Sequence, residues 1–269
     1  MAAIHAEHSG TPALATVGRT YVGTAGWSLE RAIAPASKPQ LTPLERYAEY
    51  FNCVEVDAAF PRRPRPSTLE RWRDSTPPGF RFAVNVPHSI IRDAAQAGGA
   101  LVVRQLLRLL ASLEPKLGPV SVLLPASSTF DAHAAETFLR NLVQVGAGQV
   151  AIEAHHPSWF SERADAILER HGAVRVLSDP APYPGADTSA SRGDFTYFRC
   201  HGAPRARFSA YPPEAISDLS VRLKALSAIS TRHDVYCVFD NTALGAAAVN
   251  ALSLKAEVDA PPPRVVRWP

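Results

Sequence analysis

Acidic, basic and imidazole side chains stand at the ends of several short apolar segments, and their types suit proton transfer and anion binding. Glu55 lies in CVEVDA, Glu153 in VAIEAHH, and Arg199 and His201 in YFRCHG. A carboxyl group whose pKa is shifted by burial can act as a general acid or base, and histidine titrates near neutral pH. Arginine binds phosphate and carboxylate groups. We therefore interpret Glu55, Glu153 and His201 as candidate catalytic residues, with Arg199 as a candidate anion ligand.

The elements that must position these residues are apolar segments of strand length that alternate with helical segments. We expect strands over 21–23, 53–58, 81–86, 120–124, 150–153, 174–178, 196–200 and 235–239. We expect helices over 43–50, 68–74, 100–113, 132–145, 162–171, 213–229 and 246–258, with capping boxes at Thr42/Glu45 and Ser67/Glu70. Eight strands with helices between nearly all of them predict a single α/β domain, a (β/α)8 TIM-barrel-like fold.

Alternation within the strands predicts which side chains point into the barrel. In the segment 53–58, Val54 and Val56 alternate with Glu55 and Asp57. The outer face of a barrel strand packs on helices and must be apolar, so the charged side chains should point inward. The same reasoning along the other strands predicts a polar lumen that contains Glu55, Asp57, Arg81, Asn85, Glu153, His155, Arg199, His201 and Asp240. Arg81 is expected to be a buried partner of Glu55 or Glu153.

The segments that follow the strands add further candidate ligand contacts, because active sites of such barrels lie at the carboxyl ends of the strands. Arginines cluster after two strands, at Arg62, Arg63 and Arg65 and at Arg205 and Arg207. The candidate ligand-binding residues are Trp27, Asp57, Asn85, His155, His156, Arg199, Asp240, Asn241 and Arg63. They favour acid–base chemistry on an anionic ligand that is phosphorylated or derived from nucleic acid. The alternative without function is a lattice of paired charges that fills the barrel, since unpaired buried charges are costly.

Two other functions fit the same residues. Glu55, Glu153, His201 and Asp240 come from four strands and would suit Mn²⁺, Mg²⁺ or Zn²⁺ in a metal-dependent barrel like those of isomerases or endonucleases. No HExxH or CxxC motif is present to support that interpretation. The arginine clusters, with Trp27 for base stacking, would instead suit a non-catalytic sensor or nucleic-acid-binding barrel. The sequence names no cofactor.

Length and composition bound the remaining expectations. The chain has 269 residues, of which 46% are hydrophobic and 20% charged, and its net charge of +3 is too small to imply nucleic-acid or membrane binding by itself. Three isolated cysteines and the lack of an apolar run of about 18 residues favour a cytoplasmic protein without membrane contact. We expect a flexible leader over 1–18, the barrel over 19–258 and a proline-rich tail over 259–269. We expect a monomer or a weak homo-oligomer.

Seven segments in order carry a family resemblance that covers nearly the whole barrel. They are YVGTAGWS, LERYAEYFNCVEVDAAF, TLERWRDSTPPGFRFAV, KLGPVSVLLP, IEAHHPSWF, YFRCHG and VFDNTALGAAAVNAL. On these segments the chain resembles the YecE-like family, also described as domain of unknown function seventy-two. The resemblance implies a TIM-barrel-like fold with a conserved pocket, and it implies no established reaction.

The chain departs from the pattern of that family at several pocket positions. The residues that follow Val56 read DAAFP where the family usually has NSTFY. Asn85 stands where the family usually has lysine, Leu123 where it has glutamine and His155 where it has arginine. These replacements indicate a divergent member with a changed ligand or a lost activity.

Overall fold

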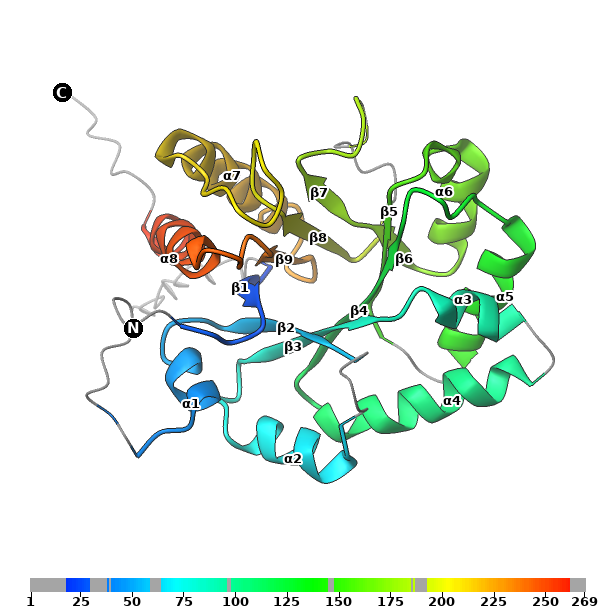
Figure 1. The fold of residues 1–269 in the computed structure, drawn as a ribbon, viewed down its shortest axis with the longest axis horizontal. Coiled ribbons are helices and arrows are strands. Elements are labelled where there is room, and N and C mark those ends of the chain that lie inside the picture. Colours follow the sequence, from blue (N-terminus) through cyan, green and yellow to red (C-terminus); the bar gives the residue numbers. More distant parts are fainter. Residues whose placement is uncertain are drawn as a thin grey trace, which may run out of the picture.

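A single parallel sheet of nine strands forms the centre of the molecule (Figure 1). The computed structural model describes residues 18–29, 38, 40–58, 64–95, 98–144, 148–184, 186 and 193–261. The strands are β1 (Thr20–Ala25), β2 (Cys53–Asp57), β3 (Arg81–Val86), β4 (Leu117–Leu124), β5 (Val150–Ala154), β6 (Ala173–Arg175), β7 (Leu177–Asp179), β8 (Phe195–Cys200) and β9 (Asp234–Phe239).

The sheet curls towards a barrel because its two edge strands are consecutive pieces of one segment. The strand order is β6-β5-β4-β3-β2-β1-β9-β8-β7, so β6 pairs with β5 while β7 pairs with β8. Only Val176 separates the two pieces, and its N–H donates to the Ile152 carbonyl at 3.0 Å. The strand expected over 174–178 is therefore one bent strand that serves both sides. The predicted TIM-barrel-like fold is confirmed, with eight strand positions around the barrel.

Helices lie around the outside of the sheet (Figure 1). They are α1 (Pro43–Ala48), α2 (Pro66–Asp74), α3 (Ser89–Ala95), α4 (Gly99–Leu110), α5 (Ala132–Gln144), α6 (Glu162–Arg170), α7 (Pro213–Ser227) and α8 (Ala246–Asp259), with short 3-10 turns η1 (Ala111–Leu113) and η2 (Pro157–Trp159). The helix α3 was not expected from the sequence. The described residues between β7 and β8 contain no helix, in agreement with the sequence.

The two predicted capping boxes have different outcomes. At α1 the Thr42 hydroxyl accepts from the Glu45 N–H, and the Glu45 carboxylate accepts from the Thr42 N–H at 2.6 Å. The box expected at Ser67 is wrong, because α2 begins at Pro66 and takes Arg65 as its N-cap without a side-chain hydrogen bond. Proline has the backbone angle that the first helical position requires, so the helix starts before Ser67.

Side chains that alternate along the strands form two separate apolar clusters. The outer cluster, between strands and helices, includes Val54, Val84, Ile152, Phe198 and Phe239. The inner cluster fills the lumen and includes Tyr21, Cys53, Ala83, Ala151, Val174, Tyr197, Tyr236 and Val238. The inward and outward faces predicted from alternation are confirmed for β2, β3, β5, β8 and β9. The inner cluster forms an apolar floor beneath the charged residues, which lie nearer the carboxyl ends of the strands.

The division of the chain expected from the sequence, with the barrel over 19–258, stays a prediction. Helix α8 runs to Asp259, one residue past the expected end. The leader expected over 1–18 lies outside the described residues except for Gly18, and so does the tail after Pro261, and both remain predictions. Among the helices of the described ranges, none is long and apolar enough to cross a membrane.

Candidate active site

The carboxyl group of Glu55 lies at the boundary between the apolar floor and the charged layer. Its neighbours in register are Ala25 on β1 and Ala83 on β3, and these small side chains leave space for it. Glu55 is only 3% exposed, and the buried Tyr197 hydroxyl donates to its Oε2 atom at 2.6 Å. The carboxyl group is therefore held in one position from below.

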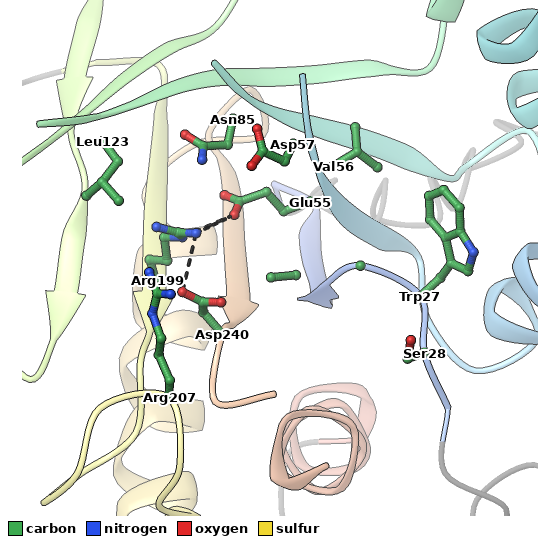
Figure 2. A pocket seen from close by; sticks show the side chains of 12 residues that line it. Trp27, Ser28, Glu55, Val56, Asp57, Asn85, Leu123, Arg199, Arg207 and Asp240 are labelled. Carbon is green, nitrogen blue, oxygen red and sulfur yellow. Dashed lines mark hydrogen bonds and ion pairs between the residues drawn. The ribbon is translucent and has the colours of Figure 1, made fainter. Parts of the chain in front are cut away.

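The Arg199 guanidinium lies among three carboxylates, two from the strands β2 and β5 and one from the residue directly after β9. Its nitrogens lie 2.8 Å from Glu55 Oε1, 2.9 Å from Glu153 Oε2 and 3.4 Å from Asp240 Oδ2. Figure 2 shows the contacts with Glu55 and Asp240. Buried charges need such compensation. Arg199 therefore connects the charged residues of this layer and also lines the pocket above it, and its expected role as an anion ligand stays a prediction.

The second carboxylate oxygen of Glu153 lies within hydrogen-bond distance of three other side chains. Its Oε1 atom lies 2.6 Å from His201 Nε2, 3.2 Å from His155 Nε2 and 3.0 Å from the Ser178 hydroxyl, which donates to it. His201 Nδ1 in turn lies 3.2 Å from Asp240 Oδ2. Both ring nitrogens of His201 thus face carboxylate oxygens, an arrangement that suits a doubly protonated ring.

These contacts shift the pKa of Glu55 in the opposite direction from the pKa of Glu153. Burial raises the pKa of Glu55 and outweighs the opposing effects of Arg199 and the hydrogen bond from Tyr197. Burial acts in the same direction on Glu153, but hydrogen bonds from His155 and His201 hold the pKa of Glu153 well below its ordinary value. Burial opposes the charged form of His201, yet hydrogen bonds with Asp240 and Glu153 raise its pKa to about 9.

Asp240 follows the same pattern as Glu153. Its burial favours the neutral acid, but the hydrogen bond with His201 and the charge of Arg199 lower the pKa of Asp240. The pKa values of two of the three carboxyl groups around Arg199 are therefore lowered, and Glu55 is the one whose pKa is raised.

A pocket of about 590 Å³ opens above Glu55 at the carboxyl ends of the strands. Figure 2 shows Asp57 and Asn85 side by side on one wall, where they are paired in register, and Trp27 to one side. The buried Oδ1 atom of Asn85 has no hydrogen-bond partner in the described part of the chain. Leu123 also lines the pocket. The pocket therefore has a polar wall formed by the side chains of Asp57 and Asn85.

Arg207 lines the opposite side of this pocket (Figure 2). Its backbone has φ of 70°, an unusual value for a residue other than glycine. Two backbone hydrogen bonds hold it there, from the Arg207 N–H to the His201 carbonyl at 2.5 Å and from the Ala243 N–H to the Arg207 carbonyl at 3.0 Å. Strained backbone of this kind occurs preferentially at functional sites.

Three expected residues lie away from the charged layer. The pairing expected for Arg81 is wrong, because Arg81 opens β3 at the amino end of the barrel, and its guanidinium lies over the Tyr21 ring. His156 caps η2, with its Nδ1 atom accepting from the Ser158 N–H at 3.2 Å. Asn241 is fully buried and donates to the Ser209 carbonyl, so it ties two loops together.

The remaining members of the predicted site divide between the pocket and the layer beneath it. Arg63 lies outside the described residues. Trp27, Asp57 and Asn85 line the pocket, together with Glu55, Arg199 and Asp240. Glu153, His155 and His201 form the adjoining cluster. Of the four residues in the metal interpretation, Glu55, Glu153 and Asp240 converge on Arg199, whose charge takes the place of a shared ion.

Reasoning from the sequence left three contributors out of the candidate site. Tyr197 was expected to point inward, but its hydroxyl was not connected with Glu55. Ser178 shares the inward face of β7, and alternation along that strand would have been the signal for it. Arg207 was noted only as part of a basic cluster, because a left-handed backbone leaves no mark in the residue type of an arginine.

Comparisons with known proteins agree with this architecture. A family model described as "Protein of unknown function DUF72" matches residues 21–267. The UPF0759 protein YecE of Escherichia coli (strain K12) is 30% identical over 172 residues, which cover 62% of this chain and 61% of YecE. This match spans about three fifths of the length of YecE.

Solved structures extend the comparison over the whole barrel. The crystal structure of a DUF72 family protein from Thermotoga maritima MSB8 has a TM-score of 0.73 and 25% identity, and the match covers 90% of this chain and 100% of that one. A structure of L-ribulose 3-epimerase, with 14% identity and a TM-score of 0.52 over 88% of this chain and 92% of that chain, shares the fold alone. Because the family model matches most of its length, this chain belongs to the DUF72 family.

Proposed function

We propose that this protein binds a small molecule with an acidic group in the pocket above Glu55 and transfers a proton on it. Glu55 is the proton donor or acceptor, and Arg207 contacts the acidic group. The observation that carries the proposal is the position of Glu55, a buried carboxyl group that nonetheless lines an open pocket. A carboxyl group between an apolar floor and a pocket can exchange its proton with a ligand that binds in the pocket.

The contrast between Glu55 and its neighbours supports an acid role. Burial raises the pKa of Glu55, whereas hydrogen bonds and the charge of Arg199 lower those of Glu153 and Asp240. Carboxyl groups whose environments push their pKa values apart are typical of acid–base sites. In this proposal, Glu153 and His201 support the site by holding Arg199 and the charged layer in place.

The pocket walls support a ligand that carries both an acidic group and hydrogen-bond donors. Arg207 brings positive charge to one side of the pocket, and its constrained backbone fixes the start of the side chain. On the other side, the polar side chains of Asn85 and Asp57 lie beside each other in the lining. Hydroxy acids and sugar phosphates have this combination of groups.

Deuterium exchange tests the proposal with defined compounds. A panel of hydroxy acids and sugar phosphates is incubated with the protein in D₂O, and NMR measures both binding and the loss of C–H signals next to the carbonyl or acidic group. We expect at least one compound to exchange. The Glu55→Gln variant should abolish exchange while binding persists, because glutamine keeps the shape but holds no transferable proton.

Two arginine variants test the anion contact. Arg207→Met should weaken binding at least about tenfold, a loss of about 1.4 kcal/mol. Arg205→Met is the matched control, because Arg205 lies in the same loop with its guanidinium 3.9 Å from the Phe208 ring centre. Exchange that survives Glu55→Gln would overturn the acid–base role. Equal binding by both arginine variants, or a panel without any binder, would overturn the ligand class.

A further inference from the structure

We propose that Glu153, His155 and His201 form a binding site for one divalent first-row transition-metal ion, with Zn²⁺ as the probe. The site goes beyond the function proposed above, because it includes neither Glu55 nor Arg207. It also differs from the four residues suggested by the sequence, since His155 takes part and Glu55 and Asp240 do not ligate.

The three ligand atoms already have the spacing that a small ion requires. Glu153 Oε1, His155 Nε2 and His201 Nε2 all lie within 4.8 Å of one another. Ligands at about 2.0–2.2 Å from Zn²⁺ in a tetrahedron lie about 3.3–3.5 Å apart. The separation of 3.2 Å between Glu153 and His155 fits this value, and the 2.6 Å separation between Glu153 and His201 needs to open by less than 1 Å.

The strands explain why the ligands converge. Glu153 is the last residue but one of β5, which ends at Ala154. His155 follows two positions after Glu153, so both side chains point to the same face. His201 comes directly after β8, across the bent strand that contains Ser178. Two histidines and one carboxylate are a donor set used by zinc and by non-haem iron enzymes.

Groups behind the ligands orient them in the way that metal sites need. Asp240 Oδ2 lies 3.2 Å from His201 Nδ1, which leaves the Nε2 atom directed at Glu153. Arg199 donates to Glu153 Oε2 at 2.9 Å, which leaves the Oε1 atom directed at the histidines. A carboxylate behind a ligating histidine is typical of metal centres, where it fixes the ring and its free nitrogen.

Charge and access also suit a cation. Glu153 and Asp240 flank His201 with two carboxylates, and Arg199, which contacts both, offsets one of these two charges. The ion would take the place of the Nε2 proton between Glu153 and His201. The His155 side chain is 35% exposed, so the cluster opens to solvent on that side while Glu153 is 2% exposed. The position towards solvent can take water or a substrate oxygen as the remaining ligand.

Calorimetric titration of chelator-treated protein with Zn²⁺ tests the site, and visible absorption of Co²⁺ reports the ligand set. We expect one Zn²⁺ per chain. Asp240→Asn should lower the affinity about 10- to 100-fold, because it leaves the ligands but loosens His201. His155→Ala should lower it further and remove the Co²⁺ spectrum. His133→Ala, at an exposed histidine of α5, is the matched control and should change neither.

Circular dichroism checks that the variants are folded. We expect His155→Ala to fold, because the His155 side chain is 35% exposed. The proposal is overturned if wild-type protein shows no saturable binding near one Zn²⁺ per chain. It is also overturned if His155→Ala binds Zn²⁺ with unchanged affinity and stoichiometry, because the ion then binds elsewhere on the chain.

Discussion

The substitution Arg199→Met tests whether one guanidinium holds the charged layer of the barrel together. Methionine removes the charge, so Glu55, Glu153 and Asp240 lose their shared partner. Breaking a buried ion pair by removing one partner costs about 3–5 kcal/mol, because a charge is left buried and uncompensated. Glu153 and Asp240 keep their bonds to His201, so we expect the loss to stay within this range for one pair rather than to triple.

Urea and thermal unfolding measure this loss. A loss of about 3–5 kcal/mol lowers the Tm by about 6–20 °C, since 1 kcal/mol corresponds to about 2–4 °C for chains of 150–250 residues. Arg104→Met, at an exposed position of α4, is the control and should change stability by no more than about 0.5 kcal/mol. Adding Glu55→Gln to Arg199→Met should recover part of the loss at high pH, where Glu55 is ionised and unpaired, and less at low pH, where Glu55 holds a proton. A loss equal to that of Arg104→Met would refute the reasoning.

Three further substitutions follow from contacts in the barrel. Glu55→Gln should gain stability relative to wild type as the pH rises above 4.5. Burial raises the pKa of Glu55, so the stability that its bound proton gives the wild type is present below 4.5 and is lost as the pH rises through the folded-state pKa. Urea midpoints with the opposite trend would contradict this. Tyr47→Phe should cost about 1–3 kcal/mol by thermal unfolding, because the Tyr47 hydroxyl accepts from the Thr24 N–H and donates to the Cys53 carbonyl, both at 2.8 Å. Gly23→Ala should destabilise by about 1–3 kcal/mol or more, because its Cβ would lie 2.0 Å from the Cys53 carbonyl oxygen; an unchanged Tm would show that this contact relaxes freely.

The strand interiors and the side chains on them could be predicted from the sequence. Apolar outer faces required Glu55, Glu153 and Arg199 to point into the lumen, and the structure brings these three together. The alternation of apolar and polar residues predicts which face of a strand a side chain lies on, but it does not predict how far along the barrel axis that side chain lies. Arg81 shares the inward face with Ala83, yet it lies at the amino end of β3, too far along the axis to reach the carboxylates.

Features that depend on barrel closure could not be predicted. The bend at Val176 divides one strand between two neighbours, and no residue type in that segment marks it. The bond between His201 and Asp240 joins residues 39 positions apart across two strand ends, so it follows from the register of the closed sheet. Arg207 reaches the pocket through a left-handed backbone held by two loop contacts.

The pKa of the Glu55 carboxyl is the quantity on which the proposed function most directly depends. A ¹³C NMR titration of the glutamate carboxyl signals, with Glu55→Gln used to assign the resonance, measures it in the folded protein. The account predicts that the signal missing from the variant titrates above the ordinary value of 4.5, because burial opposes ionisation of Glu55. A signal that titrates at or below 4.5 would contradict the account.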